Sequence, residues 1–212
     1  MPIITINTAK PGDEPERIIL NVSKSGDDTV KVRLKWGDDT DVDGHAILLY
    51  KGKLGRVDHI LSAYNLQRSI RGRRVGIIEP NDDGSFSILN GAVNHSGDAL
   101  TGNNPDVDEE ISFDPDEIPD YIDECGIFIT IHHKPDAPRV KFRDVKSPTI
   151  TVMKNDTVVQ AYNLSKDFGE FDGVQAVSFL RKPNGDWEVM PVGIGFNGDL
   201  NVILVQLSSQ SS

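Results

Sequence analysis

The amino-acid sequence predicts an all-β protein, a two-sheet antiparallel β-sandwich with a few short helical turns. Three observations predict this fold: short apolar runs recur along the chain, turn-forming residues separate them, and helix-period patterns are few. The chain has 19 glycines and 12 prolines among its 212 residues, a composition typical of many turns. Its 37% hydrophobic and 26% charged residues are the balance of a globular protein with a core.

The clearest predicted strand spans residues 29–36, where apolar side chains alternate with basic ones. Strict alternation is typical of a strand with one buried face and one exposed face. Similar short runs predict seven further strands, at residues 17–22, 46–50, 126–131, 149–153, 158–164, 173–180 and 187–192.

The segments between these runs are rich in turn-forming residues. Residues 183–186 read Pro-Asn-Gly-Asp between two apolar runs, which predicts a β-hairpin. We expect short helical turns at residues 118–123 and 201–207. No linker rich in proline, glycine or serine divides the chain, so we expect one domain over residues 1–207 and a polar C-terminal tail at residues 208–212.

The net charge of −11 arises in one part of the chain. Residues 75–133 contain 14 acidic side chains and no lysine or arginine, whereas the remainder carries 22 basic and 19 acidic residues. Clustered carboxylates repel one another unless a cation or a basic partner offsets their charge. This concentration of acidic residues has two interpretations, a solvated acidic face or a cation site. Because a nucleic-acid backbone is also negative, we expect no nucleic acid to bind the acidic surface.

Several classes of protein are excluded by what the sequence lacks. Cys125 is the only cysteine, so neither an internal disulfide nor a cysteine-based zinc site can form. No apolar run is long enough to span a bilayer, and the residues after Met1 lack the features of a signal peptide, so we expect a cytoplasmic protein. We find no Gly-x-Ser-x-Gly motif, P-loop or dinucleotide fingerprint, and we therefore expect no enzymatic activity; a hydrolase with a diffuse carboxylate site is the least supported alternative.

The first acidic segment follows the clearest strand and carries Asp39, Asp41 and Asp43 before Gly44. This alternation matches the beginning of an EF-hand calcium loop, but the twelfth position is Tyr50 instead of glutamate. Alternate carboxylates on a tight turn can converge on calcium, which prefers hard oxygen ligands. The same side chains can instead accept backbone N–H groups in a polar turn. From this segment alone, the two interpretations are equally supported.

The second acidic segment, residues 95–111, favours the cation. It contains five carboxylates together with two glycines, two asparagines and one proline. Such a composition predicts an irregular loop, in which asparagine side chains and free carbonyl groups are further calcium ligands. Two acidic loops at strand ends can share one cation, which offsets their mutual repulsion.

These segments resemble the TerD family of tellurium-resistance and stress proteins. Residues 95–109 are similar, without a gap, to the family signature His-Thr-Gly-Asp-Asn-Arg-Thr-Gly-Glu-Gly-Asp-Gly-Asp-Asp-Glu, and residues 39–49 resemble Asp-x-Asp-Leu-Asp-Ala-Ser-Ala-Phe-Leu-Leu. Further similarities bring the resemblance to residues 18–204. The resemblance implies a calcium-binding β-sandwich tied to tellurite resistance and other stresses, with proteins of a stress system as partners and no established enzymatic activity.

The chain departs from the family pattern at Ala99, Asn103, Pro105 and Val107, where the family has Asn, Glu, Asp and Asp. We therefore expect one strongly bound calcium ion per chain and a second that is weak or absent. A β-sandwich interaction or structural module that has lost metal binding is the alternative. The expected main ligands are Asp41, Asp43, Asp98 and Glu109, assisted by Asp39, Asn103, Asp106, Asp108 and carbonyl groups of residues 99–103.

Two smaller features lie outside the acidic segments. Residues 67–81 resemble an insertion in the family pattern, and we interpret their arginines as a solvated loop or a counterweight to the acidic face, in preference to a docking patch for an anionic partner. The arginines of the insertion are Arg68, Arg71, Arg73 and Arg74.

Neighbouring His132 and His133 point to opposite faces of a predicted strand and cannot chelate one ion together. We expect His132 to be packed or hydrogen-bonded.

Overall fold

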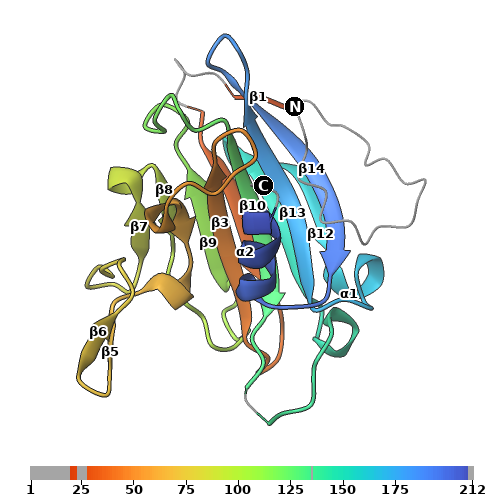
Figure 1. Ribbon diagram of the computed structural model, residues 1–212. Coiled ribbons are helices and arrows are strands. Elements are labelled where there is room, and N and C mark those ends of the chain that lie inside the picture. The colour runs from red at the N-terminus through yellow and green to blue at the C-terminus, as the bar shows by residue number, and fades with distance from the viewer. Residues whose placement is uncertain (1–19, 23–27, 135, 210–212) are drawn as a thin grey trace.

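The computed structural model describes residues 20–22, 28–134 and 136–209, and it contains two antiparallel six-stranded sheets packed face to face (Figure 1). The first sheet has the order β1-β14-β13-β10-β3-β4, and the second has the order β12-β11-β2-β9-β8-β7. Strands β5 and β6 form a separate hairpin. The predicted two-sheet β fold is therefore confirmed.

The first sheet is built from β1 (Leu20–Val22), β14 (Trp187–Phe196), β13 (Gly173–Arg181), β10 (Glu124–Ile131), β3 (Val42–Leu49) and β4 (Ile60–Leu61). The second is built from β12 (Thr157–Asn163), β11 (Thr149–Lys154), β2 (Val30–Lys35), β9 (Glu109–Phe113), β8 (Val93–His95) and β7 (Phe86–Ile88). The hairpin pairs β5 (Arg68–Ile70) with β6 (Arg73–Val75). The α-helices are α1 (Leu164–Asp167) and α2 (Leu200–Ser209), and the 3-10 helices are η1 (Val57–His59), η2 (Ala63–Asn65), η3 (Leu89–Gly91) and η4 (Phe142–Asp144).

The main core lies between the two sheets. In β2 the apolar side chains are buried and the basic ones are half-buried, as their alternation predicts. Aromatic rings link the layers: Phe113 of β9 stacks on Phe179 of β13 with ring centroids 4.8 Å apart, and it meets Trp187 of β14 edge-on at 4.9 Å. Offset and edge-on ring pairs of this kind add to the stability that burial supplies.

A second apolar cluster covers the outer face of the first sheet. Helix α2 lies across this face in Figure 1, and its Leu200, Ile203 and Leu207 pack with Ile47 of β3 and Phe128 of β10. Both faces of these strands are thereby buried, which explains why every residue of β3 and β10 is buried. Continuous apolar runs, rather than alternating ones, are typical of strands covered on both sides.

The helical expectations need one correction. Residues 118–123 form no helix; the backbone N–H of Ile122 donates to the carbonyl of Pro119 at 2.9 Å in a single turn, and β10 begins two residues later at Glu124. The helical turn expected at residues 201–207 is confirmed as α2. This helix extends to Ser209, so the predicted tail at residues 208–212 begins as helix, and residues 210–212 lie outside the described residues.

The strand predictions are confirmed with shifted ends. Residues 17–19 of the first predicted strand lie outside the described residues, and the strand itself is seen at β1. Strand β3 begins at Val42, so Asp43 and Gly44 are strand residues paired with Thr130 and Ile129 of β10, not loop residues.

None of the helices in the described part of the chain is long and apolar enough to cross a membrane.

Candidate functional site: a cluster of three aspartates

Both acidic segments contribute to one cluster at the end of the sandwich where β3 begins and β8 ends. Asp41 precedes β3, Asp43 is its second residue, and Asp98 lies in the loop between β8 and β9. One carboxylate oxygen from each of the three lies within 4.8 Å of the others. Asp43 is only 5% exposed, Asp41 is half-buried and Asp98 is exposed. We call these three side chains the aspartate cluster.

Trp36 shapes the two loops that carry the cluster. Its buried indole donates from Nε1 to the carbonyl oxygen of Thr40 at 2.7 Å, which curls residues 36–41 around the ring. Gly102 of the second loop lies against the same ring, where a Cβ atom would overlap the indole. The backbone N–H of Gly102 donates to the carbonyl of Asp38 at 2.8 Å. The two loops are therefore joined around one side chain before any cation is considered.

Glu109, an expected ligand, connects the backbone on both sides of the cluster. Its Oε2 accepts the N–H of Gly44 at 2.8 Å, and its Oε1 accepts the N–H of Ala99 at 3.1 Å. Gly44 and Ala99 directly follow Asp43 and Asp98 in the chain. Glu109 is 1% exposed, and its Oε2 also lies 3.3 Å from Nε2 of His95. Its carboxylate therefore holds two members of the cluster side by side.

Asp108 uses its carboxylate to hold the second loop in its conformation. It accepts the backbone N–H of Trp36 at 2.8 Å and that of Asn104 at 3.0 Å, and it forms an ion pair with Lys35 at 3.2 Å. Such bonds are the polar-turn role that competes with metal binding for an acidic loop residue. Asp108 and Glu109 thus hold the backbone around the aspartate cluster in place through hydrogen bonds.

The remaining expected ligands lie outside the cluster. Asp39 is exposed, and its Oδ1 is 3.4 Å from Nδ2 of Asn103, which is also exposed. Asp106 is exposed on the second loop. Of the eight expected ligands, the structure brings together Asp41, Asp43 and Asp98, with Glu109 bonded beside them.

Burial and mutual repulsion make it unfavourable for all three carboxylates of the cluster to be ionised at once. Burial, together with the neighbouring carboxylate of Asp98, raises the pKa of Asp41 to about 6. Burial, followed by the charges of Glu109, Asp41 and Asp98, raises the pKa of Asp43 well above its ordinary value. In addition, Oδ1 of Asp41 is buried and has no hydrogen-bond partner among the described residues. A buried, unpaired carboxylate oxygen is costly unless a proton or a cation compensates it.

Tyr64 and His132 support the cluster from the outer face of the first sheet. The hydroxyl of Tyr64, in η2, donates to Oδ2 of Asp43 at 3.1 Å and also contacts Nδ1 of His132. When the single phenol proton is given to Asp43, the phenol oxygen is left as an acceptor for Nδ1 of His132. Burial and the nearby Asp43 raise the pKa of Tyr64. Sequence reasoning did not place Tyr64 beside the aspartates, since no local spacing relates η2 to the end of β10.

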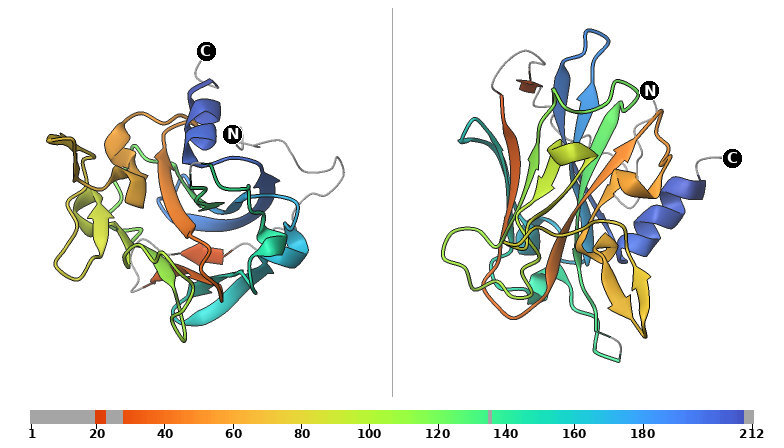
Figure 2. Two further views of the ribbon diagram at one scale, coloured as in Figure 1. Left: turned by 90° about the horizontal axis from the view of Figure 1, so that it is seen from below. Right: turned by 90° about the vertical axis from the view of Figure 1, so that its left-hand side faces the viewer.

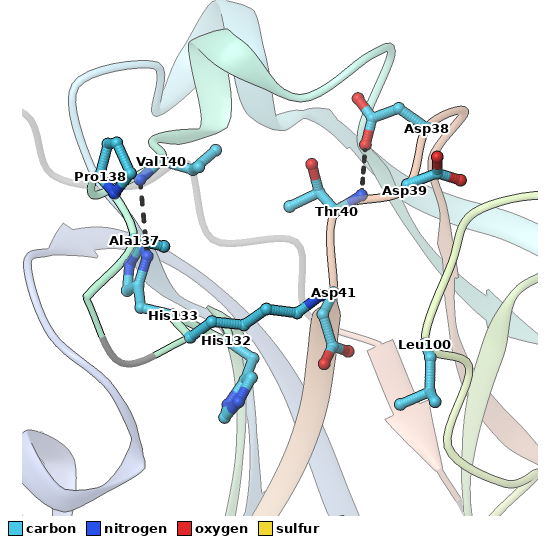
Figure 3. A pocket seen from close by; sticks show the side chains of 11 residues that line it. Asp38, Asp39, Thr40, Asp41, Leu100, His132, His133, Ala137, Pro138 and Val140 are labelled. Carbon is cyan, nitrogen blue, oxygen red and sulfur yellow. Dashed lines mark hydrogen bonds between the residues drawn. The ribbon is translucent and has the colours of Figure 1, made fainter.

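A pocket of about 510 Å³ opens beside the cluster (Figure 3). Figure 3 shows the carboxylate of Asp41 between His132 and Leu100, while Asp38 turns away to accept the N–H of Thr40. His133 reaches in the other direction, where its Nε2 lies 3.2 Å from the carboxylate of Asp172. The two histidines therefore have separate partners, and His132 has the hydrogen-bonded role expected from the sequence.

The donor set of the cluster suits a hard cation. All three clustered side chains offer oxygen atoms, the ligand type that calcium and magnesium prefer. The only thiol, Cys125, is fully buried in β10, and burial raises its pKa, so it offers no soft ligand.

Comparisons with known proteins agree with the fold. Residues 14–206 match the model of the TerD domain. The tellurium resistance protein TerD of Serratia marcescens is 27% identical over 178 residues, which cover 83% of this chain and 82% of that protein. The chemical-damaging agent resistance protein B of Clostridium acetobutylicum is 32% identical over 112 residues, 52% of this chain and 79% of that protein.

A solved structure and a further relative extend the likeness. The crystal structure of a homologue of telluride resistance protein (TerD) from Streptomyces coelicolor A3(2) superposes with a TM-score of 0.64 at 21% identity, covering 84% of this chain and 96% of that one. General stress protein 16U of Bacillus subtilis is 32% identical over 126 residues, 57% of this chain and 64% of that protein. Because the family match spans most of its length, the chain belongs to the TerD domain family.

Proposed function

We propose that this chain is a non-enzymatic calcium-binding protein of a stress-response or tellurite-resistance system, and that the aspartate cluster holds one calcium ion. The observation that carries the calcium assignment is the convergence of Asp41, Asp43 and Asp98, with one oxygen of Asp41 buried and unpaired. In this proposal the ion acts structurally or in partner binding, because it offsets the repulsion among carboxylates that two loops bring together.

The spacing of the cluster is compatible with a bound calcium ion. Two oxygen atoms that each lie about 2.4 Å from one calcium ion are at most about 4.8 Å apart. The three carboxylate oxygens fall within that limit. Calcium takes six to eight oxygens in flexible arrangements, so loop carbonyls and water would complete the shell, whereas magnesium demands a tighter octahedron and gives up water reluctantly. We therefore propose calcium in preference to magnesium, zinc or copper.

The stress-response part of the proposal is supported by the relatives. Their names describe resistance to tellurium, resistance to chemical damaging agents and general stress. The proposal includes other proteins of such a system as partners and a cytoplasmic location. A protein-interaction module without a metal remains the alternative, and an absence of both binding heat and stabilisation at millimolar calcium would favour it.

Calorimetric titration of two variants tests the calcium site. Asp98→Ala removes one of three clustered carboxylates, and we expect calcium affinity to fall at least about tenfold, which corresponds to about 1.4 kcal/mol. Asp106→Ala is the matched control, because it removes the same charge from the same loop at an exposed position outside the cluster. The unmodified chain should bind one calcium ion tightly.

The titration also distinguishes a defined site from general attraction to negative charge. Equal losses of affinity in Asp98→Ala, in Asp106→Ala and in the distant Asp116→Ala would show that a diffuse acidic surface collects the ion. Two equally tight calcium ions would contradict the single site. A competition titration in which zinc binds more tightly than calcium would contradict the choice of metal.

A further inference from the structure

Three arginines stand apart from the other arginines of the described chain. The side chains of Arg68, Arg71 and Arg73 have no hydrogen bond or ion pair with any described residue, and all three are exposed. The remaining described arginines each pair with a carboxylate: Arg33, Arg56, Arg74, Arg139, Arg143 and Arg181. In a chain with 33 acidic and 22 basic residues, these guanidinium groups are concentrated in one segment and are available to a carboxylate surface outside the chain.

The three arginines share one hairpin, which we call the arginine hairpin (residues 68–75). Arg71 and Gly72 at its turn both have positive φ angles, 49° and 75°, as in a type I′ turn. Asparagine or glycine is favoured at such positions, so an arginine at the tip adopts a backbone conformation that its side chain does not favour. The strand register places Arg68 and Arg73 on one face together with Ile70, which is 47% exposed.

The arginine hairpin projects from the body of the molecule. It stands out at the lower left of Figure 1, away from both sheets, and the right-hand view of Figure 2 also shows it extending from one side. Residues 66–78 contain four arginines and no acidic or aromatic residue. The charge at this tip is therefore accessible and is not offset within its own segment.

The composition of the hairpin and of the body favours a protein carboxylate surface over a nucleic acid. Single-stranded nucleic acids are bound through aromatic stacking platforms as well as positive charge, and the hairpin offers no aromatic ring. A long polyanion would also meet the field of the remaining chain, which carries 33 acidic against 18 basic residues. Guanidinium groups pair well with carboxylates, which they bind in a planar, two-pronged geometry.

A surface of matching chemistry exists at the other end of the same molecule. Asp114, Asp116 and Glu117, on the connection between β9 and β10, are exposed and line a hollow of about 480 Å³. No ion pair joins these three carboxylates to any described residue. The one lysine in the hollow, Lys31, already lies near Glu110 and Asp156, at 4.0 and 3.8 Å. We call this region the acidic hollow.

The hairpin and the hollow cannot meet within one chain. The connection after β9 is at the upper end of the sandwich in Figure 1, and the arginine hairpin is at the lower end; the right-hand view of Figure 2 agrees. Two different surfaces that fit each other join copies head to tail, and such contacts form open chains or closed rings. We propose that the arginine hairpin of one copy docks into the acidic hollow of a second copy of this chain.

The net charge of −11 does not prevent this contact. At physiological ionic strength, charges farther apart than about 8 Å are largely screened, whereas touching pairs still attract. Exposed ion pairs contribute little individually, so we expect weak association, detectable at protein concentrations on the order of 0.1–1 mM. Association should decrease at 1 M salt, where the Debye length is about 3 Å.

Sedimentation velocity over a concentration series tests the proposal with two variants. The hairpin variant is Arg68→Ala/Arg71→Ala/Arg73→Ala, and the hollow variant is Asp114→Asn/Asp116→Asn/Glu117→Gln. Each should be a monomer alone, whereas the unmodified chain should grow in average mass with concentration. An equal mixture should form dimers and nothing larger, because the hairpin of one variant meets the hollow of the other and both remaining surfaces are disabled.

A charge-matched control completes the test. Lys51→Ala/Lys146→Ala/Lys166→Ala removes the same charge from exposed positions outside the hairpin and should associate as the unmodified chain does. An unmodified chain that stays monomeric at about 1 mM would overturn the proposal. So would association that survives in the hollow variant, since the hairpin would then contact another surface. If the unmodified chain binds single-stranded DNA through the hairpin and does not self-associate, the partner of the hairpin is a polyanion and the proposal is wrong.

Discussion

At the scale of single residues, carboxylates in this site divide into two kinds according to their partners. Glu109 and Asp108 each accept two backbone N–H groups, whereas Asp41 has a buried oxygen without a partner among the described residues. The sequence correctly suggested that both acidic segments converge. It could not separate the two kinds, because acceptors of backbone bonds and metal ligands are the same residue types in the same pattern, and only the folded loops decide which N–H groups are within reach.

The raised pKa of Asp41 predicts a pH-dependent calcium affinity. Calcium requires the deprotonated carboxylate, so binding must displace a proton wherever the pH lies below about 6. Affinity should increase as the pH rises through about 6 and Asp41 loses its proton, and below that pH it should fall about tenfold per pH unit for each displaced proton. Calorimetric titrations at pH 5, 6 and 7 measure this. Equal affinities at pH 5 and 7 would contradict the assignment of Asp41 as a ligand.

The same shift predicts the stability of the calcium-free protein. Because the pKa of Asp41 is higher in the folded chain than its ordinary value of 3.8, protonation of this group favours folding. That contribution is fully present below the ordinary value and is lost as the pH rises through about 6. Asp43, whose pKa is also raised, acts in the same direction. Calcium should therefore stabilise the protein more at pH 7 than at pH 5, in melts compared with and without the ion.

Glu109→Gln should lower both the stability of the fold and the affinity for calcium. The amide keeps one acceptor oxygen and turns an NH₂ group toward the second backbone donor, so one of the two N–H groups, of Gly44 or Ala99, loses its partner. An unsatisfied buried donor costs about 1–3 kcal/mol. Urea unfolding measures the loss, and calcium titration measures the affinity.

Glu110→Gln is the matched control on the same strand. Glu110 is half-buried and pairs with Arg33 on the other face of β9, a position where an ion pair contributes on the order of 0–1 kcal/mol. We expect calcium affinity to be unchanged. A Glu109→Gln protein as stable as the Glu110→Gln protein would show that the two backbone bonds do not hold the site together.

At the scale of elements, long periodic strands were predictable and short or polar ones were not. The alternation in β2 predicts both its existence and its buried face. Strands β7 and β8 have three residues each, too few for a period to be recognised. Strand β3 includes Asp43 and Gly44, which favour turns on their own, because pairing with eight residues of β10 overrides local preference.

Helix α2 should contribute strongly to stability through its inner face. Ile203 is fully buried against the outer face of the first sheet, so Ile203→Ala should cost about 2–5 kcal/mol in the free energy of unfolding. Val205→Ala, in the same helix at a position 68% exposed, should change it by less than about 0.5 kcal/mol. Urea unfolding measures both. Similar small losses would show that α2 is only loosely attached to the sheet.

At the scale of the whole molecule, charge and structure are arranged along the sandwich. The aspartate cluster and its pocket occupy the end where β3 begins, whereas the exposed acidic hollow occupies the opposite end. The sequence showed that residues 75–133 carry the negative excess, but it did not show that these carboxylates divide between the two ends of the sandwich. Asp98 joins Asp41 and Asp43 at one end, whereas Asp114, Asp116 and Glu117 lie at the other. Antiparallel strands produce this separation, because each strand returns the chain to the other end.

Calcium should act on this molecule as a structural cation, with an effect on melting that can be estimated. A ligand that binds only the folded state stabilises it by about 2.7 kcal/mol at ~100 times its dissociation constant. For a chain of this length each kcal/mol raises the melting temperature by roughly 2–4 °C, so an increase of about 5–11 °C is expected. Sodium chloride should stabilise the calcium-free form by less, since it only screens the repulsion among the clustered carboxylates. Thermal melts with calcium, magnesium, sodium chloride and EDTA measure these effects; equal shifts from calcium and from sodium chloride at matched ionic strength would mean that screening alone acts, without a bound ion.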